Sequence, residues 1–249
     1  TPRYRSSAAS DVYKRQVSSQ LMSGVSRIVS TGGAFAALKD DGSVITWGDS
    51  DGGGNSSNVA SDLQSGVSQI FSTSSAFAAL KDDGSVITWG NSDLGGDSGS
   101  VALQLQSGVS QIFSTYGAFA ALKDDGSVIT WGGSIFGGDS LVVALQLQSG
   151  VAQIFANMFS FSALNEEGAV ITWGYGSSGG NSNNVSSQLQ SGVSQIFSTY
   201  EAFAALRDDG SVITWGDSRR GGDSSSVASQ LRSGVVSFAD PFQDCLLYT

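Results

Sequence analysis

Residues 76–90 read Ala-Phe-Ala-Ala-Leu-Lys-Asp-Asp-Gly-Ser-Val-Ile-Thr-Trp-Gly, and the prediction of the fold starts from them. Two mainly apolar runs, 76–80 and 85–90, flank a polar turn at 81–84. Runs with β-branched and aromatic residues are typical of strands. The Asp-Asp-Gly of the turn suits a tight connection, because Asp tolerates turn conformations and Gly84 supplies a positive φ. The stretch therefore predicts an antiparallel β-hairpin.

The same stretch recurs at a fixed period of 42 residues, and each copy contains Ile-Thr-Trp-Gly. A third strand is predicted by Gly-Val-Ser-Gln-Ile-Phe-Ser-Thr at 66–73, which precedes the hairpin. Strict self-similarity of this kind indicates a repeat architecture. We expect five units and a partial sixth. Their ranges are 17–58, 59–100, 101–142, 143–184, 185–226 and, for the partial unit, 227–238.

Both faces of each predicted sheet are apolar. Phe77 and Ala79 point to one side of their strand, while Ala76, Ala78 and Leu80 point to the other. A three-stranded sheet can bury two faces only by stacking against its neighbours. The chain is therefore expected to be all-β, a β-propeller or an open propeller-like arc of mainly three-stranded blades. A linear β-solenoid is the alternative, and the connectors are expected to form either one helical turn or an extended segment.

The two ends of the chain share nothing with the repeat. Residues 1–16 read TPRYRSSAASDVYKRQ, and the chain ends in CLLYT. Both resemble peptides that arise when sequencing adaptors are translated, although a genuine disordered tail is the alternative. We expect 1–16 and 239–249 to be non-native or disordered flanks, with 17–238 as the repeat array and five units as a lower bound.

Composition excludes several functions. The 249 residues include no His and one Cys, which rules out a Ser-His-Asp triad and a disulfide framework. The net charge of −10 argues against nucleic acid, because binding to a phosphate backbone depends on Lys and Arg. No run of about 18 apolar residues predicts a membrane span. We expect no enzyme, cofactor or metal site, and the sequence indicates no compartment.

A family resemblance follows from the pattern Gly-Val-x-x-Ile, then Ala-x-Ala-Leu-Lys-x-Asp-Gly-x-Val-x-x-Trp-Gly, then a Gly-Gly loop. This pattern resembles the RCC1-like repeats over 17–235, and is most similar to the short-repeat bacterial branch that includes the β-lactamase-inhibitor protein BLIP-II. The resemblance implies a propeller with short blades and gives the Trp of each unit a structural place in the blade, in preference to a cofactor box or a light-sensing cluster. The chain differs from the family where the usual His is replaced by Ala or Ser. The structural Trp residues are Trp47, Trp89, Trp131, Trp173 and Trp215.

Candidate binding residues come from comparing the units with one another. Two windows vary while the rest barely changes: the pair before the second strand and the loop after Trp-Gly. Exposed aromatic and Arg side chains on loops are typical of protein-binding surfaces, whereas neutral drift is the alternative explanation. We expect a protein partner. The candidate partner-binding residues are Tyr116, Ile135, Phe136, Met158, Phe159, Tyr175, Tyr200, Glu201, Arg219 and Arg220.

Other functions stay open at this stage. They are a lectin-like propeller that binds carbohydrate, a structural subunit of a larger assembly, and a guanine nucleotide exchange factor of the RCC1 type. The repeated Asp-Asp-Gly could be read as paired catalytic carboxylates, but adjacent Asp residues in an exposed turn share one solvated environment, so a turn is favoured. The loop at 49–55 faintly resembles a calcium loop but lacks the late bidentate Glu.

Overall fold

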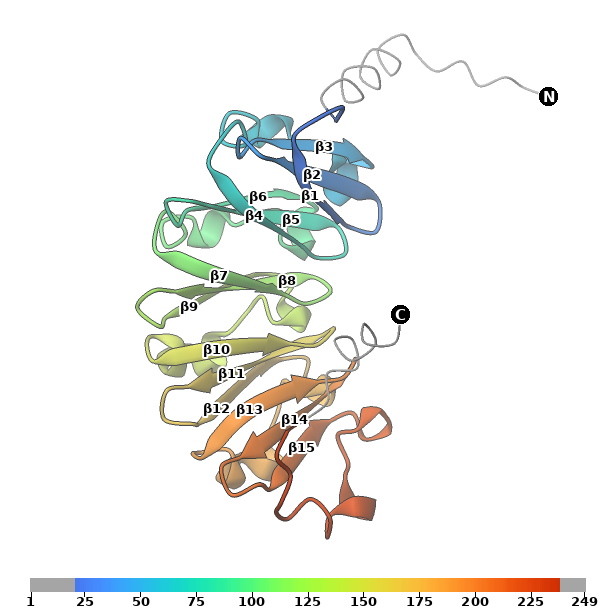
Figure 1. Ribbon diagram of the computed structural model, residues 1–249, viewed down its shortest axis with the longest axis vertical. Coiled ribbons are helices and arrows are strands. Elements are labelled where there is room, and N and C mark those ends of the chain that lie inside the picture. The colour runs from blue at the N-terminus through green and yellow to red at the C-terminus, as the bar shows by residue number, and fades with distance from the viewer. Residues whose placement is uncertain (1–20, 238–249) are drawn as a thin grey trace, which may run out of the picture. The chain divides into compact units, whose positions relative to one another are not determined.

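The computed structural model describes residues 21–237, and these residues form five three-stranded antiparallel sheets (Figure 1). The predicted flanks at 1–16 and 239–249 lie outside the described residues. The predicted hairpin and the third strand are confirmed in every repeat, and the chain is all-β with blades of the propeller type. The strands are β1 Val25–Ser30, β2 Ala34–Lys39, β3 Val44–Gly48, β4 Val67–Ser72, β5 Ala76–Lys81, β6 Val86–Gly90, β7 Val109–Ser114, β8 Ala118–Lys123, β9 Val128–Gly132, β10 Val151–Ala156, β11 Ser160–Asn165, β12 Val170–Gly174, β13 Val193–Ser198, β14 Ala202–Arg207 and β15 Val212–Gly216.

The register within a sheet is the same from repeat to repeat. In the sheet β4-β5-β6, Phe77 lies opposite Trp89 and Ala76 lies opposite Gly90. The first two strands of the sheet are paired with a bulge after Val67. The Asp-Asp-Gly turn closes the second hairpin, and Gly84 has a φ of +75°, as the sequence predicts.

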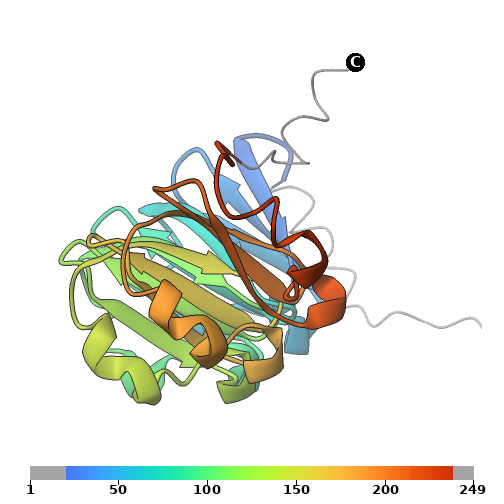
Figure 2. The same cartoon turned by 90° about the horizontal axis from the view of Figure 1, so that it is seen from below.

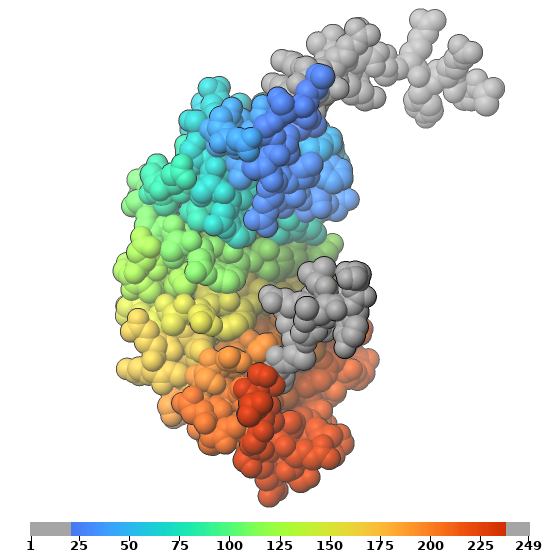
Figure 3. Space-filling view, viewed as in Figure 1, coloured from blue at the N-terminus to red at the C-terminus, as the bar shows by residue number. Residues whose placement is uncertain are grey.

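The chain divides into two compact units, which are described separately. The first unit takes in residues up to 124 together with 129–133, and it contains the sheets of the first three repeats, except for the start of β9. The sheets β1-β2-β3 and β4-β5-β6 are consecutive layers of this unit, blue and cyan in Figure 3. Between them, Ala36 and Leu38 of one sheet pack against Ile70 and Phe77 of the next.

The second unit takes in 125–128 and the residues from 134 onward, with the sheets β10-β11-β12 and β13-β14-β15. Leu164 of one sheet packs against Ile196, Phe203 and Trp215 of the next. The connectors form short helical turns, including η6 at Leu141–Leu147 and η8 at Asn183–Gln188, on the same side of the sheets (Figure 2). One of the two connector conformations expected from the sequence, the helical turn, is therefore the one found.

One repeated contact joins neighbouring sheets in both units. The indole Nε1 of Trp89 donates to the carbonyl oxygen of Gly53 in the preceding loop, 3.0 Å away. The same bond recurs from Trp215 to Gly179 at 3.1 Å. Each of these glycines has a positive φ, and a Cβ at Gly179 would come within 2.6 Å of the Phe203 ring. The Phe and Trp of one sheet therefore pack against a position of the preceding loop that only glycine can occupy.

In the part of the chain that the structure describes, no helix is long and apolar enough to cross a membrane.

Candidate functional site

The two variable windows lie at the same end of each sheet. Because the residue before the second strand and the residue after Trp-Gly stand opposite each other, their backbones are hydrogen-bonded. The amide of Asn91 donates to the carbonyl of Ser75 at 2.9 Å, and that of Tyr175 donates to Phe159 at 3.0 Å. Residues that vary between repeats thus gather at one strand end, a point that the sequence left undecided.

In the second unit this strand end carries an aromatic cluster centred on Phe159. The rings of Phe136 and Phe159 are stacked, with centroids 5.9 Å apart. Tyr175 lies 6.2 Å from Phe159 at a tilt, and Tyr200 meets it edge-on at 6.1 Å. The guanidinium carbon of Arg220 lies 5.8 Å from the centre of the Tyr200 ring. We call these five residues the Phe159 cluster.

The cluster is assembled from five separate loops. Phe136 ends the turn η5 (Ser134–Phe136), and Tyr175 precedes η7 (Gly176–Ser178). Phe159 and Tyr200 stand just before β11 and β14, and Arg220 ends η9 (Ser218–Arg220). Tyr175 is 50% exposed and Tyr200 is 53% exposed. The rings contact one another and the two Tyr rings remain open to solvent, which suits a surface that holds a partner.

Three other predicted site residues are sequence neighbours of residues in the cluster. Met158 donates its amide to the Tyr200 carbonyl at 3.2 Å. Glu201 is half-buried, and its carbonyl accepts the amide of Asp217. Arg219 is exposed and forms an ion pair with Asp217 at 3.3 Å. Because this pair is solvated, it adds little stability.

Two further predicted residues are exposed, as the sequence analysis expects. Ile135 is 61% exposed, on the helical turn that also carries Phe136. Tyr116 is 42% exposed and belongs to the first unit, where its carbonyl accepts the amide of Ser74 at 2.9 Å.

Sequence comparison missed an exposed apolar turn in the second unit. Leu141, Val142 and Leu145 of η6 are at least 79% exposed. The signal was present, since the connector between the first two sheets carries Ser57, Asn58 and Ser61 at the corresponding positions.

The fourth repeat also contains a buried polar group that the sequence analysis did not identify. The Nδ2 of Asn157 donates to the Ser178 carbonyl at 2.6 Å, and its Oδ1 accepts the amide of Ser160 at 2.9 Å. The Oγ of Ser160 donates to the same Ser178 carbonyl at 2.7 Å. In the other repeats a Thr at the Asn position makes this kind of contact, as Thr73 does to Leu94 at 2.9 Å.

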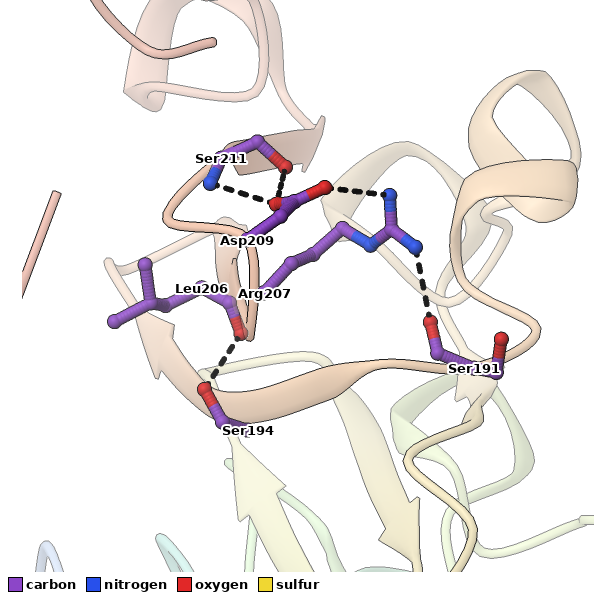
Figure 4. A network of polar contacts seen from close by, with 6 residues as sticks. All are labelled: Ser191, Ser194, Leu206, Arg207, Asp209 and Ser211. Atoms are coloured by element: carbon purple, nitrogen blue, oxygen red, sulfur yellow. Dashed lines mark hydrogen bonds and ion pairs between the residues drawn. The ribbon is translucent and has the colours of Figure 1, made fainter. Parts of the chain in front are cut away.

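The Asp-Asp-Gly turns are held by hydrogen bonds of their second carboxylate. Asp209 accepts the backbone amide of Ser211 at 2.9 Å and the Ser211 hydroxyl at 2.5 Å. Arg207 reaches from the same turn to Asp209 and to the Ser191 carbonyl (Figure 4). The hydrogen bonds from Ser211 hold the pKa of Asp209 below its ordinary value of 3.8, and the charge of Arg207 lowers this pKa further. These contacts stabilise the turn itself.

The polar side chains of the loop at 49–55 also form hydrogen bonds with nearby backbone amides. The Oδ1 of Asp49 accepts the amide of Asp51 at 3.2 Å, and that of Asn55 accepts the amide of Ser57 at 3.0 Å. Within residues 21–237 no three Asp, Glu, His or Cys side chains gather as metal ligands would.

Comparisons with known proteins concern the fold. No family model matches the chain, and no curated protein matches it. Among solved structures, human WBSCR16 is 21% identical with a TM-score of 0.45, over 86% of this chain and 68% of that one. Prp20p from Saccharomyces cerevisiae, described together with its binding to Gsp1p and histones, is 15% identical with a TM-score of 0.45. That match covers 77% of this chain and 58% of Prp20p, so the chain spans little more than half the length of the yeast protein.

Proposed function

We propose that this chain is a non-catalytic scaffold that binds a protein partner through the Phe159 cluster. One observation carries the proposal: aromatic rings from separate loops, two of them half-exposed, meet at the strand end where the repeats differ. Tyr, Phe and Arg are the residue types on which protein interfaces concentrate their binding energy. The sheets do not need these rings for packing, because other repeats carry Gly33 or Ser75 at the position of Phe159.

The distribution of these residues favours a protein over a carbohydrate. A lectin with one site per repeat would carry similar aromatic and Asp or Asn residues in each blade. The first repeat has Gly32 and Gly33 in the first window, whereas the fourth has Met158 and Phe159. A surface that is built once, from side chains of different shape, suits a single partner.

The finer family assignment belongs to the same proposal. The 42-residue spacing, the Asp-Asp-Gly hairpin and the Trp-Gly ending support membership in the short-repeat bacterial branch of the RCC1-like repeats.

Photo-crosslinking tests the proposal. A benzophenone amino acid is placed at Tyr200 in one chain and at Leu145 in another, since Leu145 is 83% exposed on the same unit. We expect a distinct protein to be trapped from position 200 and absent from position 145. Replacing Tyr175 and Tyr200 together by Ser should weaken binding of that protein about 30-fold or more, as expected at a hot spot. Equal trapping at both positions, or unchanged binding of the double variant, would refute the proposal.

A further inference from the structure

A buried asparagine of the fourth repeat bonds to two of the loops that meet at the Phe159 cluster. Asn157 directly follows β10 and is only 7% exposed. Its Oδ1 accepts the amides of Phe159 and Ser160, both at 2.9 Å, and its Nδ2 donates to the Ser178 carbonyl at 2.6 Å. Because backbone amides only donate and a carbonyl only accepts, these partners fix which end of the side-chain amide is the oxygen.

These bonds connect the backbones that carry two rings of the cluster. On one side, Asn157 holds the amide of Phe159, whose ring contacts the other three aromatic rings of the cluster. On the other side, Ser178 donates its own amide to the Tyr175 carbonyl at 3.1 Å and so closes the turn η7. The Ser160 hydroxyl adds a second bond to the Ser178 carbonyl, at 2.7 Å. The window of Phe159 and the loop of Tyr175 are therefore joined through buried polar side chains.

The other repeats make a looser version of this connection. Where the fourth repeat has Asn157 the others have Thr, and where it has Ser160 they have Ala. The Thr73 hydroxyl still donates to the Leu94 carbonyl at 2.9 Å. However, the amide of the following window residue lies 3.4 Å from the Thr hydroxyl in both the first and the second repeat. The tighter connection thus occurs in the repeat whose window carries the central ring of the cluster.

We propose that Asn157 and Ser160 are positioning residues, which hold Phe159 and Tyr175 in their binding arrangement before a partner binds. This inference rests on the proposed function of the Phe159 cluster. Ordering a side chain or a loop during binding costs affinity, so a surface whose backbone is already fixed binds more tightly. Hydrogen bonds in a buried site are stronger than those exposed to water, which suits them to this role. The fold itself does not require this pair, because Thr and Ala replace it in the other repeats.

A double variant, Asn157→Thr with Ser160→Ala, tests the proposal. It installs the pair that the second repeat has at Thr73 and Ala76, a combination that the fold already accepts. The first readout needs no partner: a trifluoromethyl-phenylalanine at position 159 reports by fluorine NMR how well this ring is ordered. We expect one narrow resonance when Asn157 and Ser160 are present, and a broadened or split resonance in the double variant.

The second readout is the affinity for the protein trapped at position 200. The double variant should bind this protein about 3- to 10-fold more weakly, the range expected when a side chain must be ordered on binding. Calorimetric titration gives the affinity and the fraction of binding-competent molecules separately. A purely structural role of the pair would lower the competent fraction and leave the affinity of the folded molecules unchanged.

Ser162→Ala is the matched control. Ser162 lies on the same face of β11 as Ser160 and is equally buried, but its hydroxyl has no partner among the described residues. This variant should keep both the narrow resonance and the affinity. A narrow resonance in the double variant, or a broadened one with unchanged affinity, would overturn the proposal. A broadened resonance supports the ordering of the ring by Asn157 even if no protein is trapped at position 200, a result that refutes only the proposed partner.

Discussion

The glycine between neighbouring sheets gives the sharpest prediction. At Gly179 a methyl group would lie 2.6 and 2.9 Å from two carbons of the Phe203 ring. The φ of +101° adds about 1–2 kcal/mol for any residue with a Cβ. Displacing the packed ring adds about 1–3 kcal/mol. Gly179→Ala should therefore lower the free energy of unfolding by about 2–5 kcal/mol.

Gly221→Ala is the matched control, because it introduces the same methyl group at nearly the same φ in the same unit. Its nearest neighbour is 3.8 Å away, so only the backbone cost of about 1–2 kcal/mol is expected. The assay is urea unfolding followed by Trp fluorescence, at a concentration where sedimentation shows monomers. Equal losses of stability in the two variants would refute the argument that the glycine is required by the ring that packs on it.

Three further predictions concern single side chains. Trp173→Phe removes the Nε1 bond to the Gly137 carbonyl and leaves a gap, so unfolding experiments should show a loss of about 2–4 kcal/mol. Ser162→Ala should stabilise the chain by about 1 kcal/mol in the same assay, because the buried Ser162 hydroxyl has no partner, whereas Ser160→Ala should destabilise it by a similar amount. The depressed pKa of Asp83, caused first by the hydroxyl of the turn serine, stabilises the fold above pH 3.8, and this contribution is lost as the pH falls through the lower folded value. Asp83→Asn should therefore flatten the fall of stability below that pH, and an unchanged acid profile would contradict this.

The sheets could be predicted from sequence because the repeats share one pattern of apolar residues and turn residues. The Asp-Asp-Gly turn fixed the hairpin through local chemistry, and apolar residues on both faces required covering sheets. The hydrogen bond from Trp89 to Gly53 could not be foreseen, because it joins residues of different repeats whose contact depends on how the sheets stack.

The binding surface could be predicted only in part. Variation between repeats selected Phe159, Tyr175 and Tyr200, which the structure brings together. It could not place the two windows at one strand end, because that depends on the pairing register. The exposure of the apolar turn at Leu141 was not predicted for a different reason. It depends on which side of a short helical turn faces the sheet.

Residues that repeat hold the sheets together, whereas residues that vary between repeats are proposed to bind the partner. A substitution scan over 134–220, scored both for folded abundance and for retention of the protein trapped at position 200, measures the two roles directly. We predict that substitutions at Trp173, Trp215 and Gly179 lower abundance. Substitutions at Tyr175 and Tyr200 should preserve abundance and abolish retention. Unchanged abundance and unchanged retention after substitution of Tyr175 and Tyr200 would contradict these separate roles, as would a loss of abundance as large as that caused by substitution of Trp173.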